Sequence, residues 1–346
     1  MSVAKRPRIA DVAKLAGVSE GTVSVVLNNR VGEHVRVSEE TQRKIWGVVR
    51  ELGYVANPIA QSLAGGQNHI LAVFTFEPIF PIDSRNFYYP FLVGIEQEAD
   101  LYGYDILLVT GANGSNNGIR HIYRDGINRL RRADGAILLG HGERGEIEQL
   151  LQERYPFVFV GRRESVEGNI SYVAADYRAA TVEIVQYLMA CGHEQIVYLS
   201  STRQTEASQD REAGIREVLG HRDTPDGVWR GEPSQLEAAT LREYLAQGYT
   251  AFVAEDDELG HQLLTVAQSL GLHCPDDFSM AVLGNPLSPL IEVPDWMSFS
   301  IPRREMGQAA LKMLIDLLKQ PVEERSSAQR QTLRCTFKAG NSVRQR

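Results

Sequence analysis

Short apolar runs alternate with amphipathic helical patterns over most of the chain. The runs begin with HILAVFTF at residues 69–76 and recur as YDILLVT, GAILLG, FVFVG, YVAAD, IVYLSS, AFVAE and SMAVLG. Parallel strands need crossover helices between them, so this order indicates parallel α/β layers. A chain of 346 residues is also too long for one ordinary domain. We therefore predict an α/β body of two parallel-sheet subdomains from residue 68 on, with a ligand cleft at the carboxyl ends of the strands.

The residues before this body follow a helical pattern instead. Val12, Leu15 and Ala16 recur at helical spacing, and Gly17 permits the backbone turn that ends a first helix. Ser19 follows as a suitable N-cap for a second helix, because its hydroxyl can accept a hydrogen bond from a free backbone N–H. This stretch predicts two short helices joined by a tight turn.

The second helix is apolar on one face. At 100° per residue its core-facing side chains are Val23, Val26 and Leu27. The opposite face carries Gly21, Ser24, Val25 and Asn28. A valine on the face turned away from the core suggests that this helix contacts something outside its own domain.

A third helix is predicted in VSEETQRKIWGVVRELGY. Ser38 is its N-cap, and Glu39 and Glu40 lie near the positive end of its dipole. Its apolar stripe consists of Ile45, Val48, Val49 and Leu52. Three helices with a tight second one favour an all-α helix-turn-helix head. The pattern alone leaves open a small helical bundle with no nucleic-acid role.

The charge of the chain is divided between these two parts. Residues 1–66 carry nine Lys and Arg against six Asp and Glu, a net charge of +3, whereas the whole chain has a net charge of −8. A basic head on an acidic body is typical of a protein that binds a polyanion through its head. The next segment, ANPIAQSLAGG, has Pro58 at a first helical position and a stop at Gly65-Gly66. A helix this short needs a partner in order to fold.

Several classes of protein are disfavoured by the sequence. The three cysteines, Cys191, Cys274 and Cys335, are far apart, so neither a disulfide framework nor a metal site is expected. The N-terminus lacks the apolar core of an export signal, and no apolar run reaches the ~18 residues of a membrane span, so we expect a cytoplasmic protein. His193 is the most tempting general base, but it has no obvious catalytic partner. We predict no enzymatic activity, no cofactor and no catalytic or metal-binding residues.

Two stretches of the head, RIADVAKLAGVSEGTVSVVLNN and VSEETQRKIWGVVRELGYVANPIAQSLAGG, closely resemble the lactose-repressor/galactose-repressor (LacI/GalR) family of bacterial transcription regulators. The resemblance continues at lower density in the body, in FLVGIEQEADLYGYDILL, ADGAILL, YVAADYRAATVEIVQYLMACGHEQIVYLS, DREAGIREVL and IPRREMGQAALKMLIDLL. It implies a head at residues 1–56, a hinge helix and linker at 57–67, and a body at 68–346. The implied body resembles periplasmic sugar-binding proteins, with the chain crossing between its two subdomains three times.

The resemblance also implies where the protein contacts DNA. Members of the family place the second helix in the major groove of operator DNA, and their hinge leucine, matched here by Leu63, wedges into the minor groove. Glu20 and Gly21 match base-reading positions, and Glu20 could accept a hydrogen bond from cytosine N4. Val25 stands where most members have an arginine, so it either packs on a thymine methyl or reads no base. The predicted DNA contacts are Ser19, Glu20, Gly21, Thr22, Ser24, Val25, Asn28, Asn57 and Leu63.

Polar residues at the strand ends are the predicted contacts of a small-molecule effector, expected to be a sugar or sugar derivative. Arginine forks and carboxylates suit the vicinal hydroxyls of a sugar, and an aromatic side chain at the start of the first body helix would wall the site. The set that the family implies is Tyr88, Tyr89, Arg162, Asp176, Arg211, Asp256 and Asn285. Asn285 stands where the family usually has an aspartate. Two alternatives remain open: strand-end charges can form salt bridges, and Asp176 can cap the helix that follows it.

The most consistent reading is a repressor that binds operator DNA as a homodimer and responds to a carbohydrate effector. The tail TFKAGNSVRQR lacks the leucine heptads of a tetramerising coiled coil, which favours the dimer. Three alternatives remain at this level. These are an activator, a regulator that needs a corepressor, and a sugar-binding protein without a DNA role. The sequence leaves open whether Trp229 lines the cleft.

Overall fold

The computed structural model describes residues 7–27, 36–54, 68–77, 87–110, 120–142, 144–164, 169–220, 227–285, 295–321, 325 and 327–346. The chain divides into two compact units, Met1–Ile70 with Arg131–Asp134, and Leu71–Leu130 with Gly135–Arg346. The predicted hinge helix, with Asn57 and Leu63, lies outside the described residues, as does Asn28. No helix among the described residues is both long enough and apolar enough to cross a membrane.

The head contains the three predicted helices, α1 (Ile9–Ala16), α2 (Glu20–Leu27) and α3 (Glu39–Leu52). Gly17 ends α1 in the left-handed conformation, with φ 68° and ψ 36°. Ser19 Oγ accepts a hydrogen bond from Thr22 N at 3.1 Å, and Ser38 Oγ accepts one from Thr41 N at 3.3 Å. The predicted caps of α2 and α3 are therefore confirmed.

The core of the head differs from the prediction at one position. Its buried side chains are Val12, Ala13, Ala16, Val23, Val26 and Ile45. Leu15 was expected in this core, but its side chain is 56% exposed. The reason is helical geometry, because α1 buries the side that carries Val12, Ala13 and Ala16, and Leu15 projects from a different side of the helix.

The first sheet of the body has six strands in the order β13-β7-β6-β5-β1-β2. These are β1 (Ile70–Thr75), β2 (Asp105–Val109), β5 (Gly135–Leu139), β6 (Phe157–Val160), β7 (Tyr172–Ala175) and β13 (Arg330–Leu333). The pairs β1–β5, β5–β6, β6–β7 and β7–β13 are parallel, with Val73 opposite Ile137 and Ile137 opposite Val158. The helices of this half are α5 (Tyr89–Tyr102), α6 (Arg144–Gln152) and α11 (Arg303–Lys319). A short hairpin, β3 (Tyr123–Arg124) and β4 (Ile127–Asn128), leads into the 3-10 helix η1 (Arg129–Arg132).

The second sheet also has six strands, in the order β14-β12-β11-β10-β8-β9. These are β8 (Ile196–Ser200), β9 (Val228–Arg230), β10 (Ala251–Ala254), β11 (Ser279–Val282), β12 (Met297–Ser300) and β14 (Thr336–Lys338). All pairs are parallel except the edge pair of β12 and β14. The helices here are α7 (Tyr177–Ala190), α8 (Glu206–Leu219), α9 (Ala238–Ala246) and α10 (Asp257–Ser269), with the 3-10 helix η3 (Pro233–Gln235). All eight predicted strand runs form strands of these two sheets.

The chain passes between the two sheets at three places, as the family resemblance predicted. It crosses after β7 at Asp176, after β12 at Ile301 and Pro302, and between β13 and β14 at Cys335. One cluster of buried apolar side chains includes Ala175, Ile301 and Cys335 together with residues of both sheets. The two subdomains thus share a continuous core at their junction.

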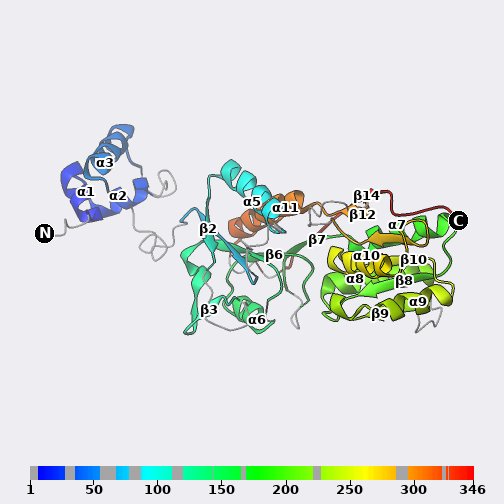
Figure 1. Ribbon diagram of the computed structural model, residues 1–346. Coiled ribbons are helices and arrows are strands. Elements are labelled where there is room, and N and C mark those ends of the chain that lie inside the picture. The colour runs from blue at the N-terminus through cyan, green and yellow to red at the C-terminus, as the bar shows by residue number, and fades with distance from the viewer. Residues whose placement is uncertain are drawn as a thin grey trace, which may run out of the picture. The chain divides into compact units, whose positions relative to one another are not determined.

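Two glycines let α5 and α11 pack closely, and Figure 1 shows these helices side by side. A Cβ atom on Gly94 would lie 2.0 Å from the Arg304 carbonyl oxygen, and one on Gly307 would lie 2.2 Å from the Phe91 carbonyl oxygen. Backbone atoms cannot move aside as the end of a flexible side chain can. Glycine is therefore required at both positions, because the two helix backbones lie too close together to admit a Cβ atom.

We predict that Gly307→Ala lowers the free energy of unfolding by about 1–3 kcal/mol, the usual effect of overpacking a tight contact. The matched control is Gly145→Ala in α6, where a Cβ meets nothing within 4 Å. The control is expected to be neutral or slightly stabilising, because alanine restricts the unfolded chain more than glycine does. Urea unfolding of both variants tests this, and equal stabilities would contradict the close helix contact.

Candidate functional site

A cavity of about 480 Å³ lies between the two sheets of the body. Five strands are each followed by a residue that lines the cavity. This residue is the first or the second after the strand: Glu77, Gly140, Arg162, Ser201 and Glu255. The cavity is thus placed at the carboxyl ends of parallel strands, where the sequence predicted it. Its volume falls within the range typical of small-molecule sites.

Four of the predicted effector contacts line this cavity: Tyr88, Arg162, Arg211 and Asp256. Tyr88 is buried, and its hydroxyl donates a hydrogen bond to Glu77 Oε2. Asp256 caps α10 by accepting a hydrogen bond from Leu259 N at 2.9 Å, and burial raises the pKa of its carboxyl group.

Three predicted contacts are not brought to the cavity lining. Tyr89 is 57% exposed, because neighbouring residues at the start of α5 point in different directions and Tyr88 takes the inward one. Asp176 caps α7, with its Oδ1 3.0 Å from Ala179 N, which is the alternative that its sequence position left open. Asn285 accepts a hydrogen bond from Ile301 N through its Oδ1, so its amide oxygen fixes the junction between the subdomains.

Arg211 is the one predicted effector contact with a buried side-chain polar atom that has no hydrogen-bond partner among the described residues. Its guanidinium carbon lies 4.2 Å from the centre of the Tyr177 ring, a cation–π contact. Its Nε is buried and has no hydrogen-bond partner among the described residues. A buried donor without a partner raises the free energy of the folded state, so an acceptor in the cavity that bonded to Arg211 would be stabilising.

Two arginines at the end of β6 form ion pairs with α8 on the opposite subdomain. Arg162 Nε lies 3.0 Å from Asp210 Oδ2, and Arg162 also pairs with Glu164. Arg163 Nη1 lies 2.6 Å from Glu206 Oε2, and its Nη2 donates to the Gly140 carbonyl at 2.6 Å. Arg162, predicted as an effector contact, is thus engaged in joining the two sides of the cavity.

Glu77 is the centre of a polar network that the sequence did not reveal. Its carboxylate accepts the Tyr88 hydroxyl, lies 3.3 Å from His141 Nδ1 and lies 3.6 Å from Arg203 Nη2 on the other subdomain. Burial alone would raise the pKa of Glu77, but the hydrogen bonds from His141 and Tyr88 and the charges of His141 and Arg203 lower it to about 2. Glu77 is therefore a carboxylate throughout the physiological pH range.

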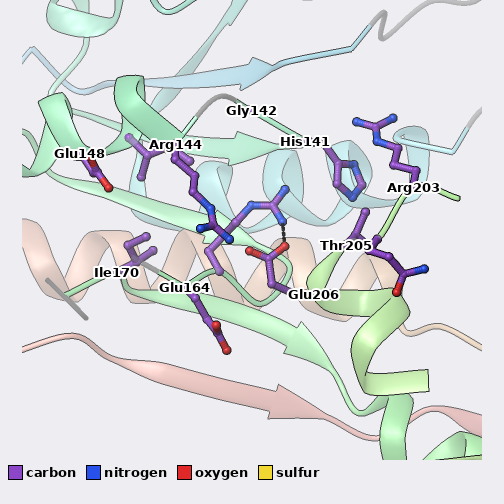
Figure 2. Close-up of a pocket in the computed structure, with 12 residues that line it drawn as sticks. His141, Gly142, Arg144, Glu148, Glu164, Ile170, Arg203, Thr205 and Glu206 are labelled. Carbon is purple, nitrogen blue, oxygen red and sulfur yellow. Dashed lines mark hydrogen bonds and ion pairs between the residues drawn. The ribbon is translucent and has the colours of Figure 1, made fainter. Parts of the chain in front are cut away.

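A smaller pocket of about 210 Å³ adjoins the cavity and is shown in Figure 2. The residues that line both spaces are His141, Arg163, Arg203 and Thr205. Arg144 and Glu148 of α6 form the far side of the pocket. Both basic and acidic side chains line the pocket, among them the ion pair of Arg163 with Glu206.

Two residues considered from the sequence lie elsewhere. His193 is buried, with Nδ1 2.8 Å from Thr250 Oγ1 and Nε2 3.0 Å from the Arg344 carbonyl oxygen. Burial lowers its pKa, so it is a neutral ring within the fold rather than a base in the cavity. Trp229 packs against the apolar core of the second sheet and is not part of the cavity lining.

The head presents a polar surface at the start of α2. Ser19, Glu20 and Gly21 are exposed, and Thr22, Ser24 and Val25 are half-buried, whereas Val23 and Val26 are buried. The hydroxyls of Ser19 and Thr22 lie 2.9 Å apart and both reach the N-terminal turn of the helix. Val25 therefore lies on the side of α2 that the sequence assigned to an outside partner.

Comparison with known proteins agrees with this arrangement. A family model of bacterial regulatory proteins of the lacI family matches residues 8–57, and one of the periplasmic binding protein-like domain matches residues 185–343. The HTH-type transcriptional regulator CelR of Thermobifida fusca is 30% identical over 322 residues, which cover 90% of this chain and 92% of that protein. The chain belongs to the lacI family of bacterial regulatory proteins.

Other relatives match this chain over nearly all of its length. The catabolite control protein A of Priestia megaterium is 27% identical and covers 93% of this chain and 95% of its own. A solved CelR–cellobiose complex matches with 26% identity and a TM-score of 0.62, over 97% of this chain and 100% of that chain. The Lac repressor dimer bound to operator and the anti-inducer ONPF has the same fold, with 20% identity and a TM-score of 0.70 over 98% of this chain and 100% of that chain. This lacI-family chain is thus a DNA-binding transcriptional regulator with a helix-turn-helix head and two α/β subdomains.

Several residues of the site were missed by sequence reasoning. They are Glu77, Phe87, His141, Arg163, Arg203 and Asp210. Glu77 and His141 are each the second residue after a strand, β1 and β5, as Arg162 is after β6, so the rule that selected Arg162 could have selected them as well. Arg203 lies in the loop before α8, and Asp210 lies within α8. Only the folded chain shows that both side chains face the other subdomain.

The lowered pKa of Glu77 predicts how the free energy of unfolding depends on pH in the acid range. Because its folded-state pKa is about 2 and its ordinary value is 4.5, the carboxylate stabilises the folded state above about pH 4.5 and loses this effect as the pH falls toward 2. Glu77→Gln should therefore be less stable than the parent at pH 7, and the difference should shrink between pH 4.5 and pH 2.

Urea unfolding at several pH values measures this difference. The control is Glu217→Gln, which removes an exposed carboxylate paired with Arg178 and should change stability little at any pH. A constant difference between Glu77→Gln and the parent across the acid range would contradict the network around Glu77.

Proposed function

We propose that this regulator is a repressor whose affinity for operator DNA is switched by a carbohydrate bound in the cavity between the two sheets. The observation that carries the proposal is the lining of the cavity, which offers the donors of Arg211 beside the carboxylates of Glu255 and Asp256. A sugar hydroxyl both donates and accepts hydrogen bonds, so a mixed set of this kind suits it. The related CelR, solved as a complex with cellobiose, supports a sugar as the ligand.

The DNA-binding part of the proposal rests on the head. We assign residues 1–56 to the DNA-binding head, 57–67 to the hinge and linker, and 68–346 to the effector-binding body. Glu20, Gly21 and Val25 would face bases, while Ser19, Thr22, Ser24 and Asn28 would hold phosphates. Asn57 and Leu63 would act in the hinge, with Leu63 as the minor-groove wedge. A homodimer on a near-palindromic operator would place two such heads on the two half-sites.

The connection between the two sites follows from the subdomain junction. A ligand that binds both sides of the cavity favours the closed arrangement, in which the ion pairs of Arg162 and Arg163 with α8 are formed. Closure in each protomer would change how a dimer presents its two heads. The effector then alters operator affinity to the extent that it binds one arrangement more tightly than the other.

The same features favour a binding protein over an enzyme. Among the described residues, no group of three or more His, Cys, Asp and Glu side chains could hold a metal ion. The histidine that most resembled a general base, His193, is engaged in the fold. We place the protein in the cytoplasm, where its operator would lie.

Arg211→Ala tests the assignment of the cavity. Operator binding is measured by fluorescence anisotropy with and without cellobiose and a panel of other sugars, using an operator selected from randomised DNA. A sugar that changes the operator affinity of the parent should leave the variant unchanged, because the unpartnered donors that hold it are gone.

A variant that responds to the sugar as the parent does would remove Arg211 from the site. A parent protein that binds its operator but responds to no sugar in the panel would contradict the proposed carbohydrate effector.

A further inference from the structure

A further arginine packs behind the lining of the cavity, and no sequence argument singled it out. Arg303 is the first residue of α11 and is only 7% exposed. Its guanidinium carbon lies 4.6 Å from the centre of the Phe87 ring, and Phe87 lines the cavity. Its chain neighbours Ile301 and Met306 line the same cavity. Arg303 therefore sits directly behind the cavity surface.

The charge of Arg303 is not compensated by a close partner. Its Nε is buried without a hydrogen bond, and it forms no ion pair with any residue that the structure describes. Buried charges in folded proteins are normally paired. The position of Arg303 is also electrostatically unfavourable, because a cation on the first turn of a helix is repelled by the positive end of the helix dipole.

Arg211 brings a second positive charge to the same place. It stacks on Tyr177, and the charges of both Arg211 and Arg303 act on the Tyr177 hydroxyl, whose pKa is raised by burial. Burial lowers the pKa of Arg303, the charge of Asp257 opposes this, and the charge of Arg211 lowers it further. Two neighbouring guanidinium groups, each with an unsatisfied Nε, thus flank one end of the cavity.

The carboxylates of the cavity are engaged with other groups. Glu77 binds Tyr88, His141 and Arg203, and Asp210 pairs with Arg162. Glu255 accepts hydrogen bonds from Ser200 Oγ at 2.8 Å and Ser201 N at 3.0 Å. Asp256 caps α10. Asp257 and Glu258, which also line the cavity, have interactions of their own. None of the carboxylates that the structure describes in the lining forms an ion pair with Arg211 or Arg303, and a bound anion can supply this negative charge.

We propose that the effector carries an anionic group, a carboxylate or a phosphate, bound between Arg211 and Arg303 at the end of the cavity walled by Tyr177 and Phe87. Arginine forks hold both groups in two-point hydrogen bonds. The carbohydrate is then a sugar acid or a sugar phosphate, and its hydroxyls face Glu255 and Asp256. This inference rests on the proposed function, since it names the class of effector that the cavity accepts.

The test compares neutral sugars with derivatives of the same sugars that carry a carboxylate or a phosphate. Thermal unfolding of the full-length protein is followed with glucose, glucuronate and glucose 6-phosphate, with the corresponding galactose series, and with cellobiose and cellobionate. A ligand that binds the folded state raises the melting temperature by mass action. We expect one anionic form to raise it more than its neutral parent sugar does, and the acid and phosphate arms show which group is bound.

Three variants assign the effect to Arg303. Arg303→Met keeps an unbranched side chain against Phe87 without charge, and Arg303→Lys keeps the charge without the fork. The anionic ligand should bind Arg303→Met roughly 10- to 100-fold more weakly than the parent, the usual loss for a hydrogen-bonded charge, with Arg303→Lys in between. Arg330→Met is the matched control, because Arg330 also stacks on a tyrosine, Tyr172, but lies on the edge strand β13 and should not affect ligand binding.

The ligand-free proteins give an independent readout. If Arg303 is held without a counter-charge in order to bind an anion, Arg303→Met should raise the melting temperature of the ligand-free protein, by roughly 2–4 °C. A clear fall in melting temperature would show that Arg303 supports the fold, and would overturn the proposal.

Different results would overturn the anionic group and the carbohydrate effector. A neutral sugar that binds and changes operator affinity, while its acid and phosphate do not bind, overturns the anionic group and leaves the carbohydrate effector in place. Binding of an anionic sugar that Arg303→Met does not weaken also overturns the proposal. If no member of the panel shifts the melting temperature, the carbohydrate effector and this inference both fail.

Discussion

The cavity depends on the chain crossing three times between two parallel sheets. Three covalent connections, at Asp176, Ile301–Pro302 and Cys335, join the subdomains at one junction and share a continuous apolar core there. Two bodies tied in this way cannot separate, and the motion that the proposed switch leaves to them is a rotation about the junction. A ligand held by strand ends on both sides therefore acts on a single degree of freedom, which is the opening of the cavity.

The polar groups around this opening serve two different purposes. The pairs of Arg162 with Asp210 and of Arg163 with Glu206 join the subdomains directly and favour closure without a ligand. Arg211 and Arg303 instead each keep a buried Nε that no described residue satisfies. In the proposed switch, the first group would set the resting balance between open and closed arrangements, and the second would make that balance sensitive to a ligand. A ligand shifts this balance by as much as it binds one arrangement more tightly than the other.

Local chemistry made much of this structure predictable. Ser19 was assigned as a cap because a hydroxyl before a helix has a nearby N–H to accept, and the strands were assigned because parallel layers need continuous apolar runs. Leu15 was misplaced because spacing alone does not fix which side of a short helix the neighbouring helices cover. Asp176 was ambiguous because capping and ligand binding use the same carboxylate. Glu77 lies at a strand end and could have been selected by the rule that selected Arg162. The role of Arg303 depends on side chains distant in sequence, such as Phe87, which no local pattern contains.

The central claim is that one equilibrium of the body serves both the effector and the operator. Linkage then requires that the effector change operator affinity by the same factor by which the operator changes effector affinity. Titrating the full-length protein with effector in the absence and presence of saturating operator, and with operator in the absence and presence of saturating effector, measures both factors. The account predicts that the two factors are equal and clearly different from one. An effector that binds tightly in the cavity while both factors equal one would contradict it.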